Sequence, residues 1–248
     1  MTTEYSQSEA APLSASRDVA ADAGRDPNSA VVEAVVNRRS VRRFLSTPVS
    51  PAVVRAILSG ASRAPSGTNF QPWHVHVVTG TARERLSRAV LAAAEAGDRS
   101  DEYAYAPSPV MEPYLSRRRQ VGYELYKLHG IERSDYANRK RVMLQNFEFF
   151  GAPVGLFFTM EKYLLHGSWL DCGMFMQNVM VLARAHGLET CPQQAWCEYG
   201  QVVHQQLGIP DTHILLSGMA LGNSDPEAPE NTLVSERVPV DQFAEFHE

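Results

Sequence analysis

The chain carries four arginines within the six residues 38–43, directly after a predicted helix. Positive charges this close repel one another unless carboxylates or bound anions lie among them. The planar guanidinium fork matches the geometry of a phosphate group, and Ser40 adds a neutral hydrogen-bond donor. Two interpretations follow: a binding site for a phosphorylated cofactor, or a solvated helix end where cations sit near the negative end of the helix dipole.

A second unusual stretch, residues 64–73, reads Ala-Pro-Ser-Gly-Thr-Asn-Phe-Gln-Pro-Trp and lies between a predicted helix and a predicted strand. Glycine adopts conformations that bring the main chain close to a ligand, and asparagine and proline favour turns. The stretch is therefore either a ligand-binding loop or an ordinary connection with Asn69 in a hydrogen-bonded turn.

Two other groups of residues could bind a metal or carry redox chemistry, and their spacing disfavours both. His74 and His76 lie on one side of a predicted strand, but no third ligand follows at useful spacing, so no metal site is predicted. Cys191 and Cys197 have five residues between them, unlike a Cys-x-x-Cys motif. We interpret both as buried thiols.

Hydrophobic periodicity predicts the helices and strands that must position these segments. The predicted strands are residues 74–79, 153–160, 188–191 and 213–220. Predicted helices begin at Ser29, at Ser50-Pro51, at a capping box of Thr81 with Glu84, at Ser134 and at Val202. A further helix over residues 169–183, with few charges, is predicted to be buried over much of its surface and to end at Gly187.

The chain is predicted to form one folded domain after a tail. Residues 1–28 are rich in Ala, Ser, Asp and Thr without an apolar period, which predicts a mobile N-terminal tail. Within the domain, residues 29–248, the periodic pattern is lost over residues 97–131, where prolines and tyrosines indicate a lid-like insertion. Residues 221–248 read as a C-terminal arm.

Composition favours a globular protein and disfavours two classes of partner. The 248 residues are 44% hydrophobic and 21% charged, and this length allows a single domain with a sizeable core. A net charge of -5 disfavours a nucleic-acid or anionic-membrane partner. Three cysteines in so long a chain indicate a reducing compartment, and no apolar run approaches the length of a membrane span. We expect a cytoplasmic protein.

Taken together, these motifs resemble the nitroreductase superfamily of FMN flavoproteins. The resemblance rests on Arg-Arg-Ser-Val-Arg at residues 38–42 and Pro-Ser-Gly-Thr-Asn-Phe-Gln-Pro-Trp at residues 65–73. Gly-Ser-Trp-Leu-Asp-Cys-Gly at residues 167–173 and Thr-Cys-Pro-Gln at residues 190–193 are most similar to the nitrobenzoate and nitroaromatic reductase branch. The resemblance implies an α+β nitroreductase-like fold, a helix-flanked central mixed or antiparallel sheet, in an intertwined homodimer.

The resemblance also implies a flavin site. In the family, the arginine segment and a late basic residue contact the FMN phosphate, a loop from the partner subunit borders the flavin, and a strand-end loop faces the ring near N5. The implied cofactor-binding residues are Arg38, Arg39, Ser40, Arg42, Pro65, Ser66, Gly67, Asn69, Pro192, Gln193, Gln194 and Arg237. Gln194-Ala195 stands where several bacterial members carry Glu-Gly, which leaves open the polar group nearest N5.

The implied reaction is a two-step exchange. NADPH or NADH gives a hydride to FMN N5 and leaves, and a small aromatic acceptor then takes the reducing equivalents. No side chain is predicted to be catalytic, because the flavin performs the hydride transfer. Tyr103, Tyr105, Tyr114 and Tyr123 could stack on a flat substrate or could simply pack the insertion onto the domain.

Other functions stay open at this point. Iodotyrosine-deiodinase relatives share Arg-Arg-Ser-Val-Arg and Ala-Pro-Ser-Gly, and grip an amino acid with a Glu, a Tyr and a Lys from the lid. Tyr123, Glu124 and Lys127 offer these residue types, so a reductive dehalogenase is an alternative. A flavin-binding module without turnover and an arginine-rich nucleic-acid binder are further alternatives, and the acidic composition disfavours the latter.

Overall fold

The computed structural model describes residues 29–248, so the tail predicted over residues 1–28 lies outside the described residues. The chain divides into two compact units. One holds the residues up to Asn37 together with Val234–Glu248, and the other is Arg38–Leu233.

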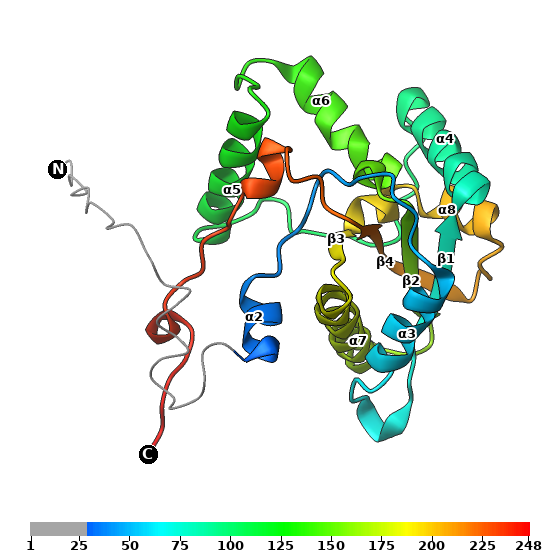
Figure 1. The fold of residues 1–248 in the computed structure, drawn as a ribbon, viewed down its shortest axis with the longest axis vertical. Coiled ribbons are helices and arrows are strands. Elements are labelled where there is room, and N and C mark those ends of the chain that lie inside the picture. Colours follow the sequence, from blue (N-terminus) through cyan, green and yellow to red (C-terminus); the bar gives the residue numbers. More distant parts are fainter. Residues whose placement is uncertain (1–28) are drawn as a thin grey trace. The chain divides into compact units, whose positions relative to one another are not determined.

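A four-stranded antiparallel sheet forms the centre of the larger unit (Figure 1). Its strands are β1 (His74–Thr79), β2 (Val154–Glu161), β3 (Glu189–Gln193) and β4 (His213–Gly222), in the order β1-β2-β4-β3. All three strand pairs run antiparallel, with a bulge between Phe158 and Thr159. The four predicted strands are confirmed, and the sheet is antiparallel rather than mixed.

Helices cover both faces of the sheet because its central strands are apolar on both sides. In β2, Leu156 and Phe158 pack against α3 (Pro51–Ala61) and α7 (His166–Ala185), whereas Phe157 packs against the opposite layer. That layer contains α4 (Gly80–Ala96) and α8 (Gly200–Leu207). Side chains alternate across a strand, so one buried strand connects two hydrophobic clusters.

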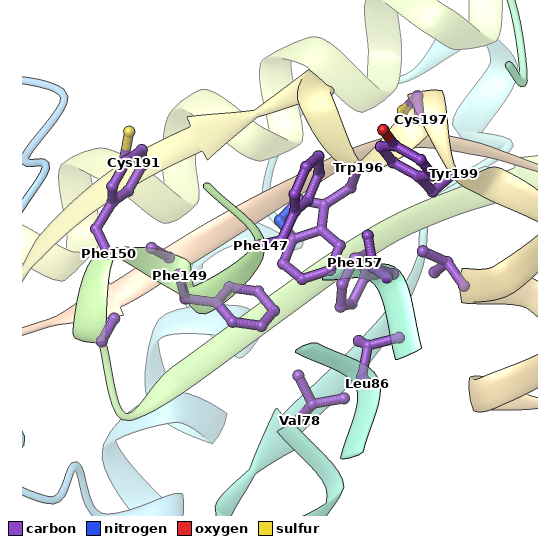
Figure 2. Packing of buried hydrophobic residues seen from close by; sticks show 14 of the residues in the cluster. Val78, Leu86, Phe147, Phe149, Phe150, Phe157, Cys191, Trp196, Cys197 and Tyr199 are labelled. Carbon is purple, nitrogen blue, oxygen red and sulfur yellow. The ribbon is translucent and has the colours of Figure 1, made fainter. Parts of the chain in front are cut away.

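The hydrophobic cluster on the side of α4 and α8 is built around the buried indole of Trp196 (Figure 2). Trp196 lies in the 3-10 turn η3 (Gln194–Glu198). Phe147 and Phe149, from η2 (Gln145–Gly151), and Phe157 surround it with ring centroids 4.5–5.3 Å from the indole. The indole also lies flat against β4 at Gly218, where a Cβ atom would come within 2.3 Å of Trp196 Cδ1. The core therefore requires a residue without a side chain at position 218.

Replacing Gly218 with Ala is expected to destabilise the protein by about 1–3 kcal/mol, because the added methyl overpacks the Trp196 site. Gly122→Ala is the matched control: it lies in a helix, and none of the described atoms lies within 4 Å of its added Cβ. That change should raise the free energy of unfolding by about 0.5–1 kcal/mol. Urea denaturation of the two variants measures both, and equal stabilities would contradict the packing account.

The predicted capping box at Thr81 and Glu84 is wrong. α4 begins at Gly80 with Thr79 as its N-cap, and among the described contacts the Thr79 side chain makes no cap hydrogen bond. Thr79 is also the last residue of β1 and pairs with Val154. The strand therefore passes directly into the helix and leaves no connection in which Thr81 could act as a cap.

Residues 97–131 contain a helix that periodicity did not predict, α5 (Tyr114–Leu128). In the described part of the chain none of its side chains is buried, and Arg117, Arg118 and Arg119 occupy successive positions. A helix without a core-facing stripe has no apolar period to detect. The next helix, α6 (Tyr136–Leu144), starts one residue later than predicted from Ser134, because Asp135 caps it through the Asn138 N–H at 3.0 Å.

The smaller unit contains α2 (Ala30–Val36) and the 3-10 turn η5 (Val240–Gln242). The predicted cap of α2 is confirmed, since Ser29 Oγ accepts from the Val32 N–H at 3.3 Å. The remaining 3-10 turns, η1 (Gly67–Asn69) and η4 (Pro229–Thr232), belong to the larger unit. Within residues 29–248, no helix is both long and apolar enough to cross a membrane.

Candidate functional site

The arginine segment, Arg38–Arg43, runs along the outer edge of β3. The Val41 N–H donates to the Thr190 carbonyl at 3.1 Å, and Ser40 pairs with Thr190 in a parallel bridge. β3 is the last strand of the sheet, so the segment covers part of an edge that would otherwise be open. The structure thus brings together two of the predicted site segments, the arginines and β3 with its end.

Two carboxylates lie at the arginine segment. Glu230, only 2% exposed, accepts from Arg43 Nε at 2.7 Å. Burial raises the pKa of the Glu189 carboxyl. The guanidinium group of Arg184, which pairs with Glu189, and those of Arg39 and Arg38 oppose that shift. The carboxylates of Glu230 and Glu189 therefore lie among the guanidinium groups of the arginine segment, and Glu189 also pairs with Arg184. Four arginines gathered at this edge of the sheet make it suited to an anion.

Ser40, within the arginine segment, lies beside the Cys191 thiol. The Ser40 side chain hydrogen-bonds with the Cys191 thiol, and Arg42 and Arg38 lie near enough to lower the pKa of that thiol. Burial is the larger effect and raises the pKa of Cys191 to about 11, so the thiol is protonated at neutral pH. The interpretation of Cys191 and Cys197 as buried free thiols is confirmed.

Asn231 holds the backbone of the arginine segment. Its Oδ1 accepts from the N–H groups of Arg42 at 2.8 Å and Arg43 at 3.2 Å, and its Nδ2 donates to the Arg43 carbonyl at 2.8 Å. One side chain thus satisfies three main-chain groups. Sequence reasoning missed Asn231 and Glu230, because both lie in an ordinary-looking turn almost 190 positions from their partners.

Replacing Asn231 with Ala is expected to release the arginine segment and to cost about 1–3 kcal/mol, since three main-chain hydrogen bonds of about 0.5–1.5 kcal/mol each are lost. Hydrogen exchange should then speed up at the amides of Arg42 and Arg43 while β2 stays protected. Thr232→Ala removes a hydrogen bond within the same turn and should leave both amides unchanged. Wild-type exchange at Arg42 and Arg43 in the Asn231 variant would contradict the assignment.

The two glutamines at the end of β3 differ in what they can offer a ligand. The Gln193 side chain is 2% exposed, donating through Nε2 to the Asn146 carbonyl at 2.7 Å and accepting from Trp196 Nε1 at 3.4 Å. Its carboxamide therefore belongs to the core. Gln194 is exposed, and Pro192 is half-buried.

Over residues 29–248, the structure places one of the four predicted substrate tyrosines at the end of β3. Tyr103 Oη donates to the Leu216 carbonyl at 2.6 Å, and its ring meets Trp169 edge-on at 4.9 Å. The other three are exposed: Tyr105 (70%), Tyr114 (65%) and Tyr123 (46%). Tyr114 and Tyr123 lie on α5.

The loop predicted to approach a ligand, residues 65–71, is fixed in a strained conformation. The Gly67 N–H donates to both carboxylate oxygens of the buried Asp171 at 3.2 and 3.3 Å, and Ser66 Oγ accepts from the Gln71 N–H at 3.0 Å. Thr68, Asn69 and Gln71 all have positive φ, at 47°, 63° and 49°. Such strain in residues other than glycine is common at functional sites.

One chain holds this loop and the arginine segment apart. The loop binds Asp171 near the start of α7, whereas the arginine segment lies beside Glu189, which pairs with Arg184 at the end of α7. At 1.5 Å per residue, Asp171 and Arg184 are about 20 Å apart along the helix. In Figure 1 the loop is the cyan segment beyond α3 and α7, on the far side of α7 from β3.

Arg237 lies in the smaller unit. Its guanidinium donates to the carbonyl groups of Ser235 and Glu236 at 3.0 and 2.9 Å and to Ser235 Oγ at 2.8 Å. These bonds fix the side chain within its own unit. Its contact with a phosphate stays a prediction.

His213 lies beside the pair His74 and His76, a contact that the spacing in the sequence did not predict. The ring of His213 lies 4.6 Å from that of His74, and His213 Nε2 lies 3.2 Å from Glu161 Oε1. Burial, followed by the charge of His213, lowers the pKa of both His74 and His76. Within residues 29–248, no group of three or more His, Cys, Asp or Glu is arranged to hold a metal ion.

Comparison with known proteins identifies the fold and the family. Residues 35–223 match the model of the nitroreductase family. The chain is 39% identical over 223 residues to nitrobenzene nitroreductase of Ectopseudomonas oleovorans, covering 89% of this chain and 98% of that protein. It is 40% identical over 212 residues to 4-nitrobenzoate reductase of Pseudomonas putida, covering 86% and 93%.

Solved structures agree with this assignment. The FMN- and NADPH-dependent nitroreductase NfnB from Sphigopyxis sp. strain HMH superposes with a TM-score of 0.86 at 41% identity, covering 88% of this chain and 99% of that chain. The FMN-dependent NfnB from Mycobacterium smegmatis, in complex with NADPH, gives a TM-score of 0.86 at 29% identity, covering 90% and 100%. The chain belongs to the nitroreductase family, and the predicted nitroreductase-like fold is confirmed.

Proposed function

We propose that the protein is an FMN-dependent oxidoreductase that passes reducing equivalents from NAD(P)H to nitroaromatic compounds by a ping-pong mechanism. The observation that carries this function is the cluster of four arginines held beside β3. The relatives named above reduce nitrobenzene and 4-nitrobenzoate, and the similar structures are FMN- and NADPH-dependent. The fold, the arginines at the edge of β3 and the relatives all support FMN-dependent reduction of nitroaromatic compounds.

The residues present fit FMN. Arg38, Arg39 and Arg42 would hold its phosphate, because guanidinium groups bind phosphate in bidentate geometry. The main chain at Pro192 and Gln193 and the side chain of Gln194 would face the ring. When bound, FMN supplies the hydride and electron chemistry, and the chain binds, orients and shields it from water.

The site is proposed to be complete only in an intertwined homodimer. Pro65, Ser66, Gly67 and Asn69 lie in the loop at Asp171, about 20 Å along α7 from the arginine segment of the same chain. A second copy would supply the loop to the arginines of the first. The apolar side chains Phe70, Leu165 and Leu170, beside the loop and at the start of α7, are exposed in the single chain, as an interface would require.

Residues 97–131 would act as a lid over the acceptor. Tyr105, Tyr114 and Tyr123 present exposed rings that could stack on a nitroarene. The three cysteines are free thiols, which suits a reducing cytoplasm.

Dehalogenation of the iodotyrosine-deiodinase type is not favoured. Tyr123, Glu124 and Lys127 all lie on α5, where Arg133 stacks over Tyr123 and Glu124 accepts from Gln120 at 3.4 Å. The relatives described above are nitroreductases. A binding module without turnover is disfavoured for the same reason.

Replacing Arg38 with Ala is expected to weaken FMN binding by about tenfold to a hundredfold, the loss expected for a charged hydrogen bond to phosphate. Arg88→Ala on α4 removes one exposed guanidinium elsewhere and serves as the control. Titration of each apoprotein with FMN, followed by flavin fluorescence, measures the dissociation constants. An unchanged constant for the Arg38 variant would overturn the phosphate assignment.

A direct assay tests the activity itself. Wild-type protein incubated with FMN is expected to turn yellow and to oxidise NADPH rapidly when nitrobenzoate is added. Protein that stays colourless, or that binds FMN without turnover, would exclude the proposed reductase.

A further inference from the structure

Asp171 is the buried anchor of the strained loop, residues 65–71. The residue is only 7% exposed, and both oxygens of its carboxylate accept from the Gly67 N–H, at 3.2 and 3.3 Å. Within residues 29–248, every other hydrogen bond of the loop joins residues at most five positions apart. Asp171 lies 104 positions from Gly67, so its carboxylate is the group that ties the loop to another element of the fold.

The loop needs such an anchor because its backbone conformation is unfavourable. Thr68, Asn69 and Gln71 have φ angles of 47°, 63° and 49°, in the left-handed region that residues with side chains disfavour. For Thr68, which is β-branched, this conformation is the most costly of the three. Such a conformation persists only where surrounding contacts hold it, and an N–H bonded to a carboxylate is held about twice as strongly as one bonded to a neutral acceptor.

The carboxylate sits on a rigid base. Asp171 belongs to α7, which packs on the sheet through Phe175 and Val179. About one helical turn beyond Asp171, the ring of Phe175 stacks on that of Trp73, just after the loop, with centroids 4.8 Å apart and ring planes 11° apart. Gly67 and the chain that leaves the loop are therefore fixed to successive turns of one helix.

The anchored loop is presented to the outside of its own chain. Thr68, Asn69 and Phe70 are exposed, whereas the carboxylate that holds Gly67 is buried. Asp171 and the arginine segment lie toward opposite ends of α7, about 20 Å apart along the helix. What Asp171 fixes is thus a surface that the arginines of the same chain do not reach.

We propose that Asp171 is a positioning residue that acts on the flavin site of the other subunit. Its carboxylate holds residues 65–71 of its own chain in the one conformation that borders the flavin bound by the arginines of the second copy. This inference rests on the proposed function, which places FMN between those two segments. Asp171 touches neither flavin nor acceptor, and its effect passes through the Gly67 N–H.

The first test is the state of the loop. Asp171→Ala removes both acceptor oxygens, and hydrogen exchange at the Gly67 amide should become about tenfold to a hundredfold faster, the range for a hydrogen bond to a charged group. FMN binding should weaken by about two- to tenfold, because a displaced loop loses contacts with the flavin. Asp171→Asn keeps the shape and one acceptor oxygen, so it should restore most of the amide protection and of the FMN affinity.

Val179→Ala is the control for general damage to α7. Val179 is buried on the same helix, and its truncation lowers the stability of the fold without removing a contact of the loop. The Gly67 amide and the affinity for FMN should stay as in the wild type.

The second test shows on which subunit Asp171 acts, using mixed dimers of two variant chains that carry different tags. Asp171→Ala paired with Arg38→Ala should bind one FMN per dimer with wild-type affinity, because one site then combines intact arginines with an intact loop. Asp171→Ala paired with Asn69→Gly should have no site of wild-type affinity, because both loops are impaired. A residue that served the flavin of its own chain would give the reverse result in both pairings.

Each outcome decides a separate point. Unchanged exchange at Gly67 in Asp171→Ala, the reverse pattern of pairings, or impaired sites in both pairings overturns the positioning role. Failure of the wild-type protein to bind FMN overturns the proposed function and this inference with it. Mixed Arg38→Ala and Asn69→Gly dimers that regain one site, while Asp171→Ala binds FMN like the wild type, overturn this inference alone.

Discussion

The length and rigidity of α7 determine where the polar segments of this protein can lie. At the start of the helix, the buried carboxylate of Asp171 binds the Gly67 N–H and fixes the strained loop. At its end, Arg184 pairs with Glu189, where β3 begins beside the arginine segment. Because the buried face of α7 packs on the sheet through Phe175 and Val179, the separation of about 20 Å cannot relax.

We propose that the flavin binds at an edge strand, because an edge has free main-chain groups and access to solvent. The arginine segment uses one of these groups, at Thr190, and Asn231 satisfies the next main-chain groups of the segment itself. Glu230 pairs with Arg43 from a buried position, and the remaining guanidinium groups of the segment are proposed to bind a ligand anion.

Sequence reasoning found the elements that follow a local rule and missed those that depend on distant partners. The apolar run of β2 and the Ser50-Pro51 start of α3 were predictable, since burial on both faces and helix capping leave local patterns. α5 was missed because it has no core-facing stripe. Gln193 and Gln194 are identical in type, and only the fold, which buries one against Trp196, separates their roles.

The most direct measurement is complementation between Arg38→Ala and Asn69→Gly chains, co-expressed with different tags so that mixed dimers can be purified. Gly accepts the positive φ of Asn69, so the second change removes the side chain without straining the loop. If each site combines the arginines of one chain with the loop of the other, a mixed dimer has one intact site and should regain about half of the wild-type activity. Mixed dimers as inactive as their parents, or a purely monomeric protein, would contradict a site built from two chains.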